Sequence, residues 1–193
     1  MLTMMKKPGD YIEETRTRFA TLTDKVLSLY PAGADDITKR SMADLYRDLT
    51  FGWPTYAWAT LQSKTGRSPM FVYYFDQNQP ASVLTSFLKS NRAFHGSDCL
   101  YAFGHLEMYE PIISARYTLE DKKLSEIIIE YWTNFVKSGN PNGKKLPEWP
   151  VFHEGKPSVM YLKSYPEAGT YPNIDKIKLI DEYFKLKRES PSK

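Results

Sequence analysis

The chain has 193 residues, enough for one ordinary domain, and its 41% hydrophobic and 25% charged residues are typical of a globular protein. A net charge of +3, without a basic stripe, gives no indication of a nucleic-acid partner. The single cysteine, Cys99, excludes an internal disulfide and a cysteine-based zinc site. No apolar run approaches the length of a membrane span, and residues 1–7 lack the apolar core of a signal peptide.

The first third of the chain is expected to be helical. Apolar residues recur at helical spacing, with charged residues between them, over residues 10–29, 35–49 and 55–63. Gly52 and Pro54 predict a break before the third of these helices.

A strand is expected next, over residues 70–75. This run is nearly all aromatic and β-branched, which is typical of a strand covered on both faces. A polar loop over residues 76–80 and a short helix over residues 81–89 should follow it.

The clearest helix should span residues 118–137, after an irregular stretch that runs through Pro111. Thr118 followed by Asp121 resembles a capping box, and large apolar residues follow at helical spacing on one broad face. Such a face must be packed against something large, because burying one large aliphatic side chain contributes about 1.5–3 kcal/mol.

Two short strands and a last helix are expected to complete the chain. Residues 149–152 and 159–162 should form a small β-hairpin around a turn at residues 154–157, and an amphipathic helix should span residues 173–188. No repeat or linker interrupts the sequence, so we expect residues 1–193 to form a single unit.

One histidine stands in a turn, within Arg92-Ala-Phe-His-Gly-Ser-Asp98. Gly96 allows a backbone conformation that a Cβ would hinder, and Ser97 and Asp98 are expected to start a short helix by accepting from its free N–H groups. An imidazole on such a turn suits a general base, because it titrates near neutral pH. The alternative is that His95 only fills the loop.

Neighbours of His95 have alternatives of their own. Asp98 could orient the imidazole, although a helix-starting carboxylate is the simpler interpretation. Cys99 could form a nucleophile pair with His95, but its position inside a short helix favours a packed thiol. His105 and His153 are expected to be ordinary surface or loop residues.

Several kinds of chemistry leave no motif in this sequence. There is no Gly-x-Ser-x-Gly nucleophile elbow, no glycine-rich phosphate loop and no His-Glu-x-x-His zinc motif. We therefore expect no metal and no cofactor.

An ordered set of segments resembles the C-terminal part of type-B carboxylesterases, the carboxylesterase/cholinesterase family of α/β-hydrolases. These segments are Asp48–Phe51, Phe71–Phe75, Ala93–Asp98, Tyr101–Gly104, Leu124, Tyr131–Phe135, Gly139–Asn142 and Trp149–Pro150. One departure is Asp98-Cys99, where the family usually has glutamate followed by an aliphatic residue.

The resemblance implies a fold and a role. It implies an α/β class: a partial α/β-hydrolase domain, mostly helical, with the last sheet strand and a small β-hairpin. His95 would be the triad histidine, the general base for a serine nucleophile that acts on carboxylic esters. The family order of serine, acid and histidine would place the other two groups upstream of this chain. The chain alone is therefore predicted to be inactive.

The expected partners follow from the same resemblance. They are a small carboxylic ester and either the missing N-terminal part of the same enzyme or a second copy, joined through exposed apolar surface. Two alternatives stay open: a catalytically silent relative that uses the fold for protein contacts, and an unrelated helical binding module.

Overall fold

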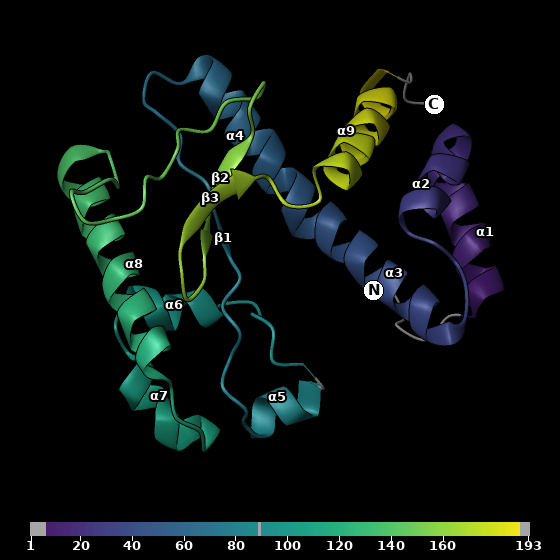
Figure 1. Ribbon diagram of the computed structural model, residues 1–193. Helices are drawn as coiled ribbons and strands as arrows, with labels where there is room; N and C mark the ends of the chain where they lie inside the picture. Colours follow the sequence, from purple (N-terminus) through teal and green to yellow (C-terminus); the bar gives the residue numbers. More distant parts are fainter. Residues whose placement is uncertain (1–6, 89, 190–193) are drawn as a thin grey trace. The chain divides into compact units, whose positions relative to one another are not determined.

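The structure is a computed structural model that describes residues 7–88 and 90–189. The chain forms two compact units, one made of Met1–Ala59 with Asn173–Lys193 and the other of Thr60–Pro172 (Figure 1). The single unit expected from the sequence stays a prediction.

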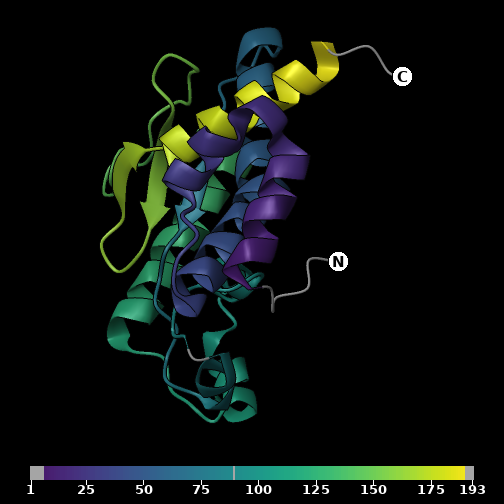
Figure 2. The same cartoon turned by 90° about the vertical axis from the view of Figure 1, so that its right-hand side faces the viewer.

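The first unit is built from helices. They are α1 (Pro8–Phe19), the 3₁₀ turn η1 (Ala20–Leu22), α2 (Thr23–Leu29), α3 (Asp35–Arg47), the π-helical turn η2 (Asp48–Gly52), the start of α4 (Trp53–Thr65) and α9 (Ile174–Glu189). Helices α1, α2 and α9 lie close together (Figure 2). The expected helix over residues 10–29 is therefore divided, because Ala20 has a positive φ of 47° and a 3₁₀ turn follows it.

The predicted break at Gly52 and Pro54 is wrong. The chain stays helical through η2, in which the Trp53 N–H bonds five residues back to the carbonyl of Asp48. Pro54 then stands in the first turn of α4, where a proline is tolerated best.

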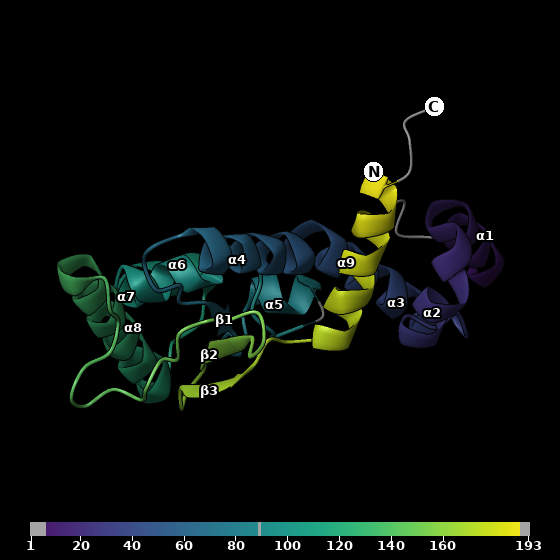
Figure 3. The same cartoon turned by 90° about the horizontal axis from the view of Figure 1, so that it is seen from above.

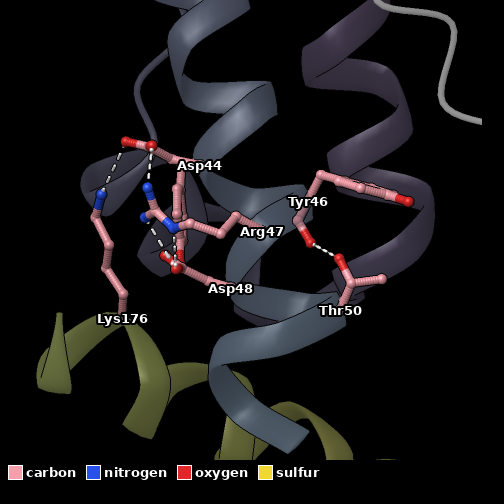
Figure 4. A network of polar contacts seen from close by, with 7 residues as sticks. Asp44, Tyr46, Arg47, Asp48, Thr50 and Lys176 are labelled. Carbon is pink, nitrogen blue, oxygen red and sulfur yellow. Dashed lines mark hydrogen bonds and ion pairs between the residues drawn. The ribbon is translucent and has the colours of Figure 1, made fainter. Parts of the chain in front are cut away.

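A buried carboxylate, Asp48, ties this unit together (Figure 4). It accepts hydrogen bonds from the Tyr30 hydroxyl and from Arg47 Nε, both at 2.9 Å. Arg47 also pairs with Asp44 at 2.8 Å, and Lys176 of α9 lies 3.6 Å from the same Asp44 carboxylate. This network joins α3, η2 and α9 through charged groups.

The second unit contains a three-stranded sheet. Its strands are β1 (Tyr73–Phe75), β2 (Ser158–Leu162) and β3 (Glu167–Thr170), in the order β1-β2-β3. β1 pairs with β2 in parallel, and β2 pairs with β3 antiparallel. Helices α5 (Val83–Leu88), α6 (Ser97–Ala102), α7 (Leu106–Ile113) and α8 (Leu119–Ser138) complete the unit, together with the end of α4.

The hairpin expected between residues 149–152 and 159–162 is wrong, because only its second strand forms, as β2. Trp149 forms no ladder, because its backbone N–H and carbonyl are taken by the side chain of Asn142 at 2.6 and 3.0 Å. The partner of β2 is β3 instead. The sequence Glu167-Ala-Gly-Thr170 lacks the aromatic and β-branched pattern that marks strands, so the backbone pairing decides it.

The strand expected over residues 70–75 is regular only over β1. β2 provides it with a parallel neighbour, and β1 forms one edge of the sheet in the part of the chain that the structure describes. Tyr73 is 37% exposed, so this chain does not cover both faces of the strand as predicted.

The long helix α8 confirms the sequence-based prediction. Thr118 Oγ1 accepts from the Asp121 N–H, and the Asp121 carboxylate accepts from the Thr118 N–H, which together make the capping box. Leu124, Ile128 and Tyr131 are fully buried and pack with residues of β2 in one core. Helices α6 and α8 lie side by side (Figure 3).

The stretch expected to be irregular through Pro111 contains helix α7. Pro111 lies near its end, and the helix stops at Ser114, which has a φ of 50° and donates its N–H to the Glu110 carbonyl. The expected short helix over residues 81–89 is α5, although Lys89 lies outside the described residues. The last helix, α9, is confirmed within one residue.

None of the helices described here has both the length and the apolar character needed to cross a membrane.

Candidate functional site

His95 is exposed on a turn between α5 and α6. Ser97 stabilises the turn, because its backbone N–H and Oγ both donate to the Phe94 carbonyl, at 3.0 and 2.7 Å. Gly96 has a φ of 83°, a conformation that a Cβ would strain. His95 is thus an exposed residue on a turn whose backbone is stabilised by Ser97 and Gly96.

Helix α6 begins at Ser97 as expected, but Ser97 and Asp98 do not cap it as predicted. Gly96, not Ser97 or Asp98, is the residue that precedes the helix, and no side chain caps it. Ser97 bonds backwards to Phe94, whereas the Asp98 carboxylate accepts from the Tyr73 hydroxyl at 2.8 Å. Asp98 therefore joins α6 to β1. Burial, the hydrogen bond to Asp98 and the negative charge of Asp98 together raise the pKa of Tyr73.

Cys99 is exposed, so the packed thiol expected from the sequence is wrong. It lies four residues after His95, in the first turn of α6, and both residues line the same hollow. Its Sγ lies 4.0 Å from a carboxylate oxygen of Asp98.

The hollow beside His95 has a volume of about 330 Å³. Its wall is mostly apolar, from Phe94, Leu100 and Ile113, and the Ser82 and Thr85 side chains add hydroxyl groups. An imidazole at the edge of such a hollow can exchange a proton with a group bound there, while the apolar wall can hold a small uncharged molecule.

A second buried carboxylate belongs to Asp121, which is 3% exposed. Its Oδ1 accepts from Gln77 Nε2 at 2.7 Å and from the Tyr101 hydroxyl at 2.8 Å. Its Oδ2 accepts from the Thr118 N–H and Oγ1, each at 2.8 Å. Burial, with the bond to Asp121 and its charge, raises the pKa of Tyr101, which therefore stays neutral.

The sequence singled out Asp121 only as a capping residue. Its other two partners are 20 and 44 residues away along the chain, and no spacing rule connects them. The sequence likewise predicts Tyr73 only as a strand residue.

The other two histidines are exposed, as expected: His105 stacks on Phe103, and His153 forms an isolated bridge with Lys156. Within residues 7–88 and 90–189 the structure shows no group of three or more side chains that could hold a metal.

A comparison with known proteins matches residues 4–179 to the model of the carboxylesterase family. The para-nitrobenzyl esterase of Bacillus subtilis (strain 168) is 32% identical over 155 residues, which cover 80% of this chain and 29% of that protein. The liver carboxylesterase of Sus scrofa is 31% identical over 135 residues, which cover 69% of this chain and 23% of that protein.

Solved structures agree. A thermophilic PNB esterase superposes with a TM-score of 0.69 at 28% identity, over 91% of this chain and 34% of that one. The parallel strand pair, the His95 turn and the helix packed behind it thus have the fold of an α/β-hydrolase. The chain belongs to the carboxylesterase family. It spans less than a third of the length of these two curated relatives.

Proposed function

We propose that this chain is the C-terminal segment of a serine carboxylesterase and that His95 is its general base. The observation that carries the proposal is an exposed imidazole, in a chain of this family, on a turn whose backbone is stabilised by the hydrogen bond from Ser97 to the Phe94 carbonyl. The relatives are named as esterases, and those names apply to the relatives themselves. By analogy, we propose an uncharged or aromatic carboxylic ester as the substrate class.

The chemistry assigned to His95 needs two groups that would lie upstream. A serine Oγ attacks the ester carbonyl, and His95 takes the hydroxyl proton as the bond forms. The imidazolium then returns this proton to the leaving alcohol when the tetrahedral intermediate collapses. An upstream carboxylate would hold the imidazole in the right tautomer.

A hybrid enzyme tests this role. Residues 4–179 replace the matching part of the Bacillus subtilis para-nitrobenzyl esterase, and hydrolysis of a p-nitrophenyl ester is measured. Once the hybrid is active, His95→Gln should lower kcat by roughly 10³-fold or more, because triad groups act as a unit. His153→Gln, which changes another exposed histidine, is the matched control and should leave kcat unchanged.

Two results would contradict the proposal. One is an active hybrid whose His95→Gln variant keeps its rate. The other is a stoichiometric fluorophosphonate adduct on the isolated chain, read by intact mass, since that would reveal a working serine within these 193 residues.

An apolar groove suggests a macromolecular partner as well. It lies between β1 and α8, has a volume of about 250 Å³, and is lined by Phe71, Tyr73, Tyr131, Trp132, Phe135, Val136, Pro141 and Trp149. The indole N–H of Trp149 and the hydroxyl of Tyr131 both bond to backbone carbonyls, so these two groups are satisfied within the chain.

We propose that the remainder of the same enzyme covers this groove and the edge of β1. The edge strand offers backbone groups for pairing, and the relatives are more than three times as long as their match to this chain. The isolated chain should then bind a hydrophobic dye, and adding the upstream part should abolish that binding. If dye binding is lost because the chain self-associates as its concentration rises, a second copy covers the groove instead. A monodisperse monomer that binds no dye would contradict the proposal.

A further inference from the structure

The two ends of the segment that holds His95 are fixed by groups that meet at Asp121. On the upstream side, the Gln79 N–H donates to the Asn91 carbonyl at 2.6 Å, and Gln79 Nε2 donates to the Gln77 carbonyl at 3.1 Å. Gln77 in turn donates its side-chain amide to Asp121. The approach to the turn is thereby tied to the start of α8.

On the downstream side, the link is Tyr101 of α6. Its hydroxyl donates to Asp121, and its carbonyl accepts from Ser125 Oγ of α8 at 2.7 Å. Helix α6 begins at Ser97, two residues after His95. Any tilt of α6 would therefore move the backbone that carries the imidazole.

Asp121 can hold both sides only because it is a carboxylate. Its two oxygens accept four hydrogen bonds from three separate segments: the loop after β1, α6 and the residue before α8. An asparagine in its place would turn an NH₂ group toward two of these donors. Two buried donors would then lack an acceptor, which the surrounding structure must relieve by moving.

We infer that Asp121 is a positioning residue for His95: its carboxylate locks α6 and the loop after β1 in place, and so sets where the imidazole stands. The consequence for catalysis rests on the proposed function of His95, whereas the effect on the position of His95 does not.

The test compares Asp121→Asn with Asp48→Asn. Both wild-type carboxylates are buried and both accept from a buried tyrosine hydroxyl, at 2.8 Å for Asp121 and 2.9 Å for Asp48. Asp48 belongs to the other unit, where it bonds to Tyr30 and Arg47. It therefore controls for general loss of stability.

The first readout is the NMR signal of the imidazole in the chain labelled on its three histidines, with His95 assigned by His95→Gln. Asp121→Asn should shift the His95 signal and leave the His153 signal unchanged. Asp48→Asn should leave the His95 signal in place. The inference is overturned if His95 is unaffected by Asp121→Asn, or if both variants move it equally.

The second readout is the active hybrid. Asp121→Asn should lower kcat about 10- to 100-fold with little change in KM, because a small misplacement of a catalytic group slows the chemical step. Unchanged kcat with a displaced His95 would leave the positioning role standing and contradict the role of His95 as base.

A milder variant covers the case in which Asp121→Asn does not fold. Tyr101→Phe removes one of the four hydrogen bonds to Asp121 and keeps the ring. It should shift the His95 signal in the same way, and an unmoved signal in this variant would also overturn the inference.

Discussion

Replacing Tyr101 by phenylalanine removes one buried hydroxyl group, which donates to Asp121 and also bonds to the Gln79 side chain. The side chain is fully buried, and its ring packs against Phe75 and Tyr117 with centroids 5.0 and 5.8 Å apart. Phenylalanine keeps these contacts and removes only the hydroxyl that donates to Asp121 at 2.8 Å. Asp121 retains its bonds from Gln77 and Thr118.

The expected loss of folding stability follows from the negative charge of the Asp121 carboxylate, which accepts this hydrogen bond. A hydrogen bond to an ionised group contributes about 1.5–3 kcal/mol, more than a bond between neutral groups. For a urea m-value of about 2 kcal/mol/M, the midpoint of unfolding should fall by roughly 0.7–1.5 M. Equilibrium urea unfolding at neutral pH, followed by circular dichroism, measures this shift.

The control is Tyr165→Phe, because Tyr165 is 81% exposed and loss of its hydroxyl should leave the midpoint unchanged. A Tyr101→Phe variant with the midpoint of the parent chain would refute the view that the buried Asp121 network stabilises this unit. A change in m-value would instead indicate that the variant no longer unfolds from the same native state.

Two further predictions concern α8 and the pH dependence of folding. Leu124→Ala should lower the free energy of unfolding by about 2–5 kcal/mol, because Leu124 is fully buried in the core of the second unit; urea unfolding measures it, and Val136→Ala, at an exposed position of the same helix, should change little. Burial raises the pKa of Tyr131 from 10.0 to about 12, so the folded state holds this proton more tightly than the unfolded state, and the contribution of Tyr131 to stability should be constant below pH 10 and be lost between pH 10 and 12. This contribution amounts to roughly 2–3 kcal/mol, and Tyr131→Phe should make the fall of stability above pH 10 shallower, while Tyr73 and Tyr101, whose pKa values are also raised, keep part of the fall. An equally steep fall in the variant would contradict the assignment.

Local signals in the sequence predicted most of the helices. The capping pair Thr118 and Asp121 and the apolar face beyond it placed α8 within one residue at each end. The predictions failed where one residue type is compatible with two kinds of local structure. Pro54 predicts a break and Pro111 stands in a stretch expected to be irregular, yet each lies in a helix near one end, where a proline is tolerated because few backbone bonds are lost.

Strand pairing could not be obtained in the same way. β3 has no strand pattern of its own, and it forms because β2 lies beside it and offers backbone groups at matching register. Trp149 is of a residue type that favours strands, but its backbone N–H and carbonyl form hydrogen bonds with the Asn142 side chain. Such pairings depend on which segments meet, and composition does not contain that information.

Most of the helices, the resemblance to the family and the turn around His95 could be predicted from the sequence, because they depend on residue types at short spacing or in a characteristic order along the chain. The groups that support that turn are known only from the fold. Gln77, Tyr101 and Thr118 meet at Asp121 through hydrogen bonds that span 3 to 44 residues, and Asp98 meets Tyr73 across 25. Buried polar groups must find partners wherever the fold brings them, so their partners become known only when the chain is folded.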